Sequence, residues 1–183
     1  RDRYVLFAAN LVQIQPDIWE NSAKMALAKS LAAKNPEDIK NSVQDLIYRL
    51  NRAMAITGPQ PRHYSLMARG YAAIREEANY RQALEKSVSL SRYHNYNERA
   101  ALAGYYIYTK EYNKLKDLVM STYYLNKDYF GSAYAESDPE KNKKYTAMNS
   151  MLEVLKTQSL ENKDKETYLL TSKILTDIGL VTR

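Results

Sequence analysis

The residues between Asn35 and Pro61 constrain the fold most, because they mark both ends of one amphipathic helix. Asn35 can cap the helix, Pro36 takes the first helical position, and two acids follow in the first turn. The segment 58–61, with one glycine and two prolines, ends the pattern. One apolar stripe recurs between these limits at spacings of three or four residues: Ile39, Val43, Leu46, Leu50 and Met54. This pattern predicts a helix with one buried face.

Similar signals recur along the chain. Asp17, with Glu20 three residues later, has the spacing of a capping box, and Pro139 follows Asp138 at another helix start. No segment alternates apolar and polar residues for long enough to predict a strand. We therefore predict about eight helices: 17–33, 36–57, 62–77, 79–90, 98–110, 111–125 and two after residue 138.

Helices of this length joined by short turns pair as antiparallel hairpins. A chain of 183 residues suits one domain with a real core. We predict an all-α protein in a single domain over residues 1–183, folded as a bundle of hairpins or a short irregular solenoid. A long loop at residues 126–138 is expected before the last helical pair.

Residues 62–126 resemble a tetratricopeptide repeat. Gly70 and Gly104 each lie in the first helix of a predicted pair, and a tyrosine follows each glycine. The second helices also begin alike, at residues 79–84 and 111–115. The resemblance implies stacked helical hairpins with a groove that binds peptides.

A second resemblance concerns residues 34–46. This lysine-rich start of a helix is similar to one in PsbQ-like extrinsic subunits of photosystem II. The resemblance implies a basic helical bundle that attaches to a membrane complex in the thylakoid lumen.

Basic charge gathers in the segment from residue 46 to residue 75, which has no Asp or Glu, in a chain of net charge +6. Its arginines are Arg49, Arg52, Arg62, Arg69 and Arg75. A guanidinium suits paired contacts with carboxylates or phosphates, so this segment predicts docking on an anionic partner. An acidic protein surface fits best, a membrane-bound complex is one setting, and nucleic acid fits less well because no nucleic-acid-binding signature accompanies it. The competing interpretation is pairing within the chain, to Glu37, Asp38, Glu76 or Glu77.

Aromatic residues offer a second candidate surface. The predicted loop 126–138 contains Tyr129 and Phe130 beside a Gly-Ser pair, and loops of this length often bind partners. Tyr105, Tyr108 and Tyr112 share one helical face. Both groups can instead fill the space between helices.

No residue pattern predicts catalysis. The chain has no cysteine, and neither His63 nor His94 has the partners that a metal site needs. Phosphate-binding loops and nucleophile motifs are also missing from the sequence. We predict no enzyme activity, metal, cofactor or small-molecule substrate. The uncharged run 4–16 is too short to span a bilayer. The chain begins at Arg1, which would fit a processed protein exported to an organelle lumen or the periplasm, although no residue identifies the compartment.

Overall fold

The computed structural model describes the backbone of residues 2–91, 96–130 and 139–181, and the side chains of 17–91, 96–127 and 146–178. Within these ranges it contains eight α-helices and no strand, which confirms the predicted all-α class. Where we predicted one domain, the contacts group the chain into two compact units, Arg1–Ser91 and Arg92–Arg183.

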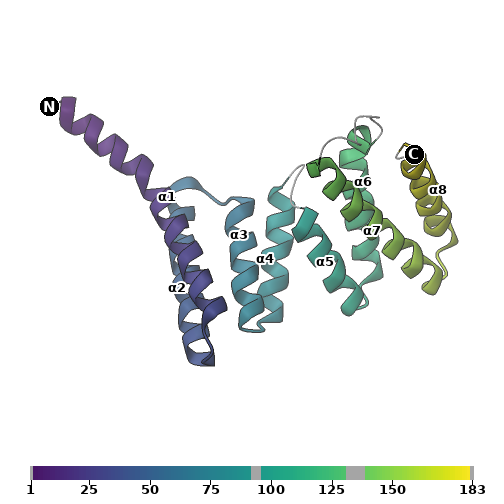
Figure 1. The fold of residues 1–183 in the computed structure, drawn as a ribbon, viewed down its shortest axis with the longest axis horizontal. Helices are drawn as coiled ribbons and strands as arrows, with labels where there is room; N and C mark the ends of the chain where they lie inside the picture. The colour runs from purple at the N-terminus through teal and green to yellow at the C-terminus, as the bar shows by residue number, and fades with distance from the viewer. Residues whose placement is uncertain (1, 92–95, 131–138, 182–183) are drawn as a thin grey trace. The chain divides into compact units, whose positions relative to one another are not determined.

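Unit 1 consists of two helical hairpins (Figure 1). Its helices are α1 (Asp2–Ala32), α2 (Pro36–Thr57), α3 (Pro61–Ala73) and α4 (Glu77–Leu90). Helix α1 packs along α2, and α3 packs along α4. Helix α3 also contacts both α1 and α2, so it joins the two hairpins into one core.

Helix α2 has the ends that the sequence predicts. The Asn35 side chain accepts a hydrogen bond of 3.0 Å from the backbone N–H of Glu37. At the other end Gly58 adopts a positive φ of 76°, and its N–H donates to the carbonyl of Met54. The predicted stripe is buried at Val43, Leu46 and Leu50, whereas Met54 and Ile39 are half-buried. Leu50 and its neighbours therefore form the centre of unit 1.

Helix α3 approaches α2 closely at one glycine. A Cβ atom added to Gly70 would lie 2.6 Å from Leu46 Cδ2 and 3.3 Å from Val43 Cγ1. A side chain at this position would displace the buried Leu46 side chain or move α3 away from α2. Gly104 in α5 differs, because no atom lies within 4 Å of an added Cβ. The two glycines of the tetratricopeptide-like pattern therefore have different packing roles.

Helix α1 corrects one predicted boundary. It runs without a break from Asp2 to Ala32, so Pro16 lies inside it and Asp17 does not cap a new helix. A proline inside a helix removes one backbone hydrogen bond and costs about 3 kcal/mol. The residues after Pro16 offset this cost by packing, since Ala23, Ala26 and Leu27 are buried.

Unit 2 contains α5 (Tyr96–Tyr108), α6 (Tyr112–Phe130), α7 (Pro139–Glu161) and α8 (Lys165–Val181). Helix α7 packs on α8, and α5 and α6 also contact each other and α7. On α7, the side chains of Met148, Met151, Leu152 and Leu155 are all buried. These side chains form the core of unit 2 together with Leu115, Val119, Ile174 and Ile178.

Helix α6 corrects the predicted loop at residues 126–138. The helix continues to Phe130, so residues 126–130 are helical. None of these five residues is glycine or proline, and the Asn126 side chain donates a hydrogen bond back to the Thr122 carbonyl. Gly131 is the first residue that disfavours a helix. Residues 131–138 lie outside the described part of the chain.

Candidate docking surfaces

Two of the candidate arginines, on α2, contact residues of unit 1. The Arg49 guanidinium lies 2.7 Å from the Asp45 carboxylate and also donates to the Ser22 hydroxyl of α1. The Arg52 guanidinium lies 5.8 Å from the centre of the Trp19 ring, a distance suited to a cation–π contact. Both arginines therefore help to hold α1 against α2.

Arg62 belongs to a polar cluster between α1 and α3. The Glu20 carboxylate accepts bonds from Arg62 at 2.7 Å and from His63 Nε2 at 2.8 Å. Glu20 and His63 are buried, while Arg62 remains exposed. A buried carboxylate requires such partners, because desolvation of an unpaired charge is costly. The acidic partners of Arg49 and Arg62 are Asp45 and Glu20. Neither is one of the four acids that the sequence suggested as partners.

Arg69 and Arg75 differ from the other three. Both side chains are exposed, and no ion pair of either is recorded within the described part of unit 1. Arg75 lines a pocket of about 540 Å³ between the start of α2 and the end of α3. We call this the Arg75 pocket; its residues are Pro36, Ile39, Lys40, Ala73, Ile74 and Arg75. Two cations thus border a largely apolar hollow.

Arg75 also belongs to a turn that occurs three times in the described part of the chain. Arg75, Lys110 and Lys163 have positive φ angles of 58°, 57° and 58°, and each lies between the two helices of a hairpin. At every turn the N–H of the basic residue donates to the carbonyl three residues earlier, and the next N–H donates to the carbonyl five residues before it. This is the Schellman pattern, in which glycine usually takes the left-handed position.

Sequence reasoning missed this repeat, although it has a sequence signal. Each basic residue is followed by an acid: Arg75-Glu76, Lys110-Glu111 and Lys163-Asp164. The C-terminal end of a helix carries partial negative charge and the next N-terminal end carries partial positive charge. A base followed by an acid therefore complements both helix ends. Because of this turn, α3 ends at Ala73 and α4 begins at Glu77. Both boundaries lie a few residues earlier than those predicted from the sequence, 62–77 and 79–90.

One carboxylate of the α7–α8 turn, that of Asp164, has several hydrogen-bond partners. Asp164 accepts hydrogen bonds from Lys116 Nζ and Tyr112 Oη, both at 2.9 Å. It also caps α8 by accepting from the N–H and hydroxyl of Thr167. The bond from Lys116 is the main cause that lowers the pKa of Asp164 far below its ordinary value, and Thr167 and Tyr112 act in the same direction. The Asp164 carboxylate is therefore ionised at neutral pH, and the Lys116 ammonium balances its negative charge.

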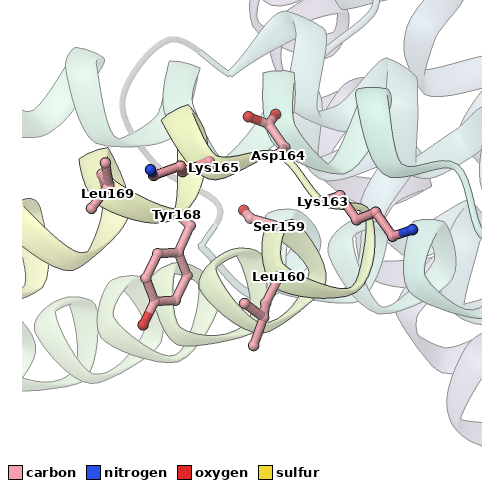
Figure 2. A pocket seen from close by; sticks show the side chains of 7 residues that line it. All are labelled: Ser159, Leu160, Lys163, Asp164, Lys165, Tyr168 and Leu169. Carbon is pink, nitrogen blue, oxygen red and sulfur yellow. The ribbon is translucent and has the colours of Figure 1, made fainter.

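A second pocket, of about 370 Å³, lies beside this turn (Figure 2). We call it the Lys163 pocket; besides Asp164, its residues are Ser159, Leu160, Lys163, Lys165, Tyr168 and Leu169. Figure 2 shows Asp164 directed away from the side on which Leu160 and Tyr168 lie. The turn thus separates a polar face, which bonds to α6, from an apolar face.

The aromatic candidates have varied positions. Tyr129 and Phe130 form the last two residues of α6, but their side chains lie outside the described part of the chain. Tyr108 is 73% exposed, whereas Tyr105 is half-buried. The half-buried Tyr112 donates its hydroxyl to Asp164, so it has a structural role. The three tyrosines therefore do not form a uniform buried or exposed face.

Neither the scan against protein-family models nor the search of curated proteins found a match to this chain. Across the residues that the structure describes, no three His, Cys, Asp or Glu side chains converge in a way that could hold a metal ion. In the same part of the chain, no helix combines the length and apolar character needed to cross a membrane.

Proposed function

We propose that this protein is a non-catalytic adaptor or complex subunit that binds an acidic segment of a partner protein. The observation that carries the proposal is the Arg75 pocket, where Arg75 and Lys40 border an apolar hollow without a recorded ion pair of their own in the described part of the chain. A partner can satisfy both features with a carboxylate next to an apolar side chain.

Available charge favours Arg75 over the α2 arginines. Arg49 and Arg52 already contact Asp45 and Trp19, so a partner would have to replace those interactions. No such contact of the exposed Arg75 is recorded within the described part of unit 1, and Arg75 projects from a turn whose backbone is already ordered by hydrogen bonds. Binding at Arg75 therefore does not have to order this part of the backbone, which lowers the entropic cost of binding. Arg69, exposed on α3, adds positive charge to the same unit and would accelerate association with an acidic partner.

A tetratricopeptide-like peptide-binding module is the second candidate. The turns at Arg75 and Lys110 have the same hydrogen-bond pattern, and each joins the two helices of one hairpin, α3–α4 and α5–α6. That repetition supports an array of helical hairpins, and such arrays commonly bind extended peptides. Both candidates assign the protein to binding, but only the first places an acidic segment at Arg75.

The test is a charge removal that does not damage the fold. Arg75→Gly removes the cation and places glycine at a left-handed position, where it is favoured. Lys40→Gln removes the second cation of the pocket. We expect the double variant to capture at least about tenfold less partner from the native source, equivalent to about 1.4 kcal/mol. Capture by the unchanged protein should also fall as salt increases, since salt screens exposed charges.

Lys110→Gly is the matched control. It makes the same backbone change at an equivalent turn, but Lys110 lines neither the Arg75 pocket nor the Lys163 pocket. Its capture of the partner should equal that of the unchanged protein. Equal capture by the Arg75→Gly/Lys40→Gln variant would contradict the proposal, provided that its melting temperature shows an intact fold.

A further inference from the structure

The Lys163 pocket has a composition that the fold itself does not require. Leu160 on α7 and Leu169 on α8 both line it, although their exposed fractions are 66% and 56%. Folding gains little from side chains that remain this exposed. Exposed leucines on two sides of one hollow are instead typical of a binding site, where a partner covers them.

The charge available to a ligand beside this pocket is positive. Asp164 is neutralised by Lys116 and bonded by Tyr112 and Thr167, so its carboxylate is committed to the fold. Lys163 and Lys165, on either side of Asp164, are exposed, and no ion pair of either is recorded in the described part of unit 2. In Figure 2 their side chains extend in opposite directions from the turn.

Nearby acids do not cancel these two lysines within the pocket. Glu161 accepts a hydrogen bond of 2.7 Å from Gln158 on the same helix, and Glu166 follows in the first turn of α8. Neither acid lines the hollow. An anionic ligand that reached the leucines would therefore meet Lys163 and Lys165 at the rim.

We infer that the Lys163 pocket is a second binding site, which takes one apolar side chain of an acidic peptide segment. The apolar side chain would occupy the hollow between Leu160 and Leu169, and carboxylates on either side of it would pair with Lys163 and Lys165. The volume of about 370 Å³ is at the lower end of the range for ligand pockets and suits a single large side chain. The Schellman turn and the Thr167–Asp164 cap hold the rim in place before binding.

This site is independent of the proposed function of unit 1, because all its lining residues come from the α7–α8 hairpin of unit 2. It can therefore be tested in an Arg75→Gly/Lys40→Gln background, which removes the cations of the Arg75 pocket. A negative result in the test of one pocket then does not change the conclusion about the other pocket.

The probe is a short dye-labelled peptide with one phenylalanine between glutamates, titrated into the full chain while anisotropy is measured. Two control peptides replace the phenylalanine with alanine or the glutamates with lysine. We expect Lys163→Gly combined with Lys165→Gln to weaken binding of the probe by at least about tenfold, as for the loss of two charged contacts. Lys110→Gly should leave the affinity unchanged, and both control peptides should bind at least about tenfold more weakly than the probe.

A site-specific signal comes from leucine methyl resonances in NMR spectra. The methyl groups of Leu160 and Leu169 should shift with the probe and saturate at the same concentration as the anisotropy. Unshifted methyl groups, undiminished affinity of the double variant, or equal binding of the alanine peptide would each overturn the inference. Shifts produced by vesicles of anionic phospholipid but not by the peptide would overturn it in favour of a membrane surface.

Discussion

The α3–α4 and α7–α8 turns have the same backbone but are supported by different interactions. At the first, the carboxylate of Glu76 forms no hydrogen bond that caps α4, and the preceding helix is fixed by the close approach of Gly70 to Leu46. At the second, Asp164 caps α8 and binds side chains of α6. A close packing contact flanks the first turn, where the Glu76 carboxylate accepts a bond from the Asn79 side chain, whereas a carboxylate with several partners supports the second.

This difference shows that the local hydrogen-bond pattern does not determine how a hairpin is held to its neighbours. Because packing is sensitive to volume, the α3–α4 hairpin should respond most to an added methyl group. Because an ionised carboxylate loses its bonds when it is protonated, the α7–α8 hairpin should respond to pH. Three sets of substitutions test this contrast.

Gly70→Ala should have the largest effect. The new Cβ would lie 2.6 Å from Leu46 Cδ2, and Leu46 is fully buried, so it cannot move without disturbing the core. Overpacking costs about 1–3 kcal/mol, which exceeds the ~0.5–1 kcal/mol that alanine gains over glycine in a helix. We expect a lower free energy of unfolding in urea.

Gly104→Ala is the matched control, since its Cβ would meet no atom within 4 Å. This substitution should stabilise the protein by about 0.5–1 kcal/mol through helix propensity alone. A Gly70→Ala variant that is as stable as the Gly104→Ala variant would show that α3 does not need a glycine against α2.

Asp164→Ala should lower the melting temperature at neutral pH and remove part of its acid dependence. The bonds from Lys116, Thr167 and Tyr112 lower the pKa of Asp164 below its ordinary value of 3.8. The unfolded chain therefore binds a proton here at a higher pH than the folded chain does. The stabilisation is complete above about pH 4 and is lost as the pH falls through the folded-state pKa.

The measurement is the melting temperature from pH 7 to pH 2, compared with Asp117→Ala as the control. Asp117 is exposed on α6, and no bond to its side chain is recorded in the described part of unit 2. The difference between the unchanged protein and Asp164→Ala should shrink at acid pH. A constant difference over this range would show that the Asp164 carboxylate stabilises the turn independently of its charge.

Glycine at the left-handed position should change the free energy of unfolding least, and it should increase this free energy at all three turns. Arg75→Gly, Lys110→Gly and Lys163→Gly each relieve a positive φ, which costs non-glycine residues about 1–2 kcal/mol. After the greater flexibility of unfolded glycine is included, we expect each variant to gain about 0.5–1 kcal/mol. Lys173→Gly, inside α8, should instead lose about 1 kcal/mol. Equal losses in all four variants would contradict the left-handed assignment.

Local signals predicted most of the helical structure. Asn35 and Gly58 bound α2 as expected, and its stripe identified Leu46 and Leu50 as core. Pro16 shows the limit of such signals, because packing beyond it keeps α1 continuous. The extension of α6 through residues 126–130 was missed because apolar periodicity is weak at the end of a helix, whereas the lack of a helix-breaking residue was the better guide.

The candidate sites were less predictable than the helices. The sequence identified Arg75 as the last arginine of a segment, 46–75, that contains no Asp or Glu. No sequence pattern indicated that Lys40 would line the same pocket as Arg75. The Lys163 pocket was not predicted at all, because its leucines, Leu160 and Leu169, lie on two different helices. Only the turn between α7 and α8 brings them to one hollow.

By itself, the sequence determined the all-α class, the α2 core face and the basic character of the chain, because caps, periodicity and charge act over a few neighbouring residues. Tertiary structure alone decided which cations are free. Arg62 meets Glu20 because α3 packs on α1, while Arg75, in the turn after the same helix, has no ion pair recorded in the described part of unit 1. A charge is neutralised by whatever the fold brings within a few ångströms, and that depends on packing between segments distant in sequence.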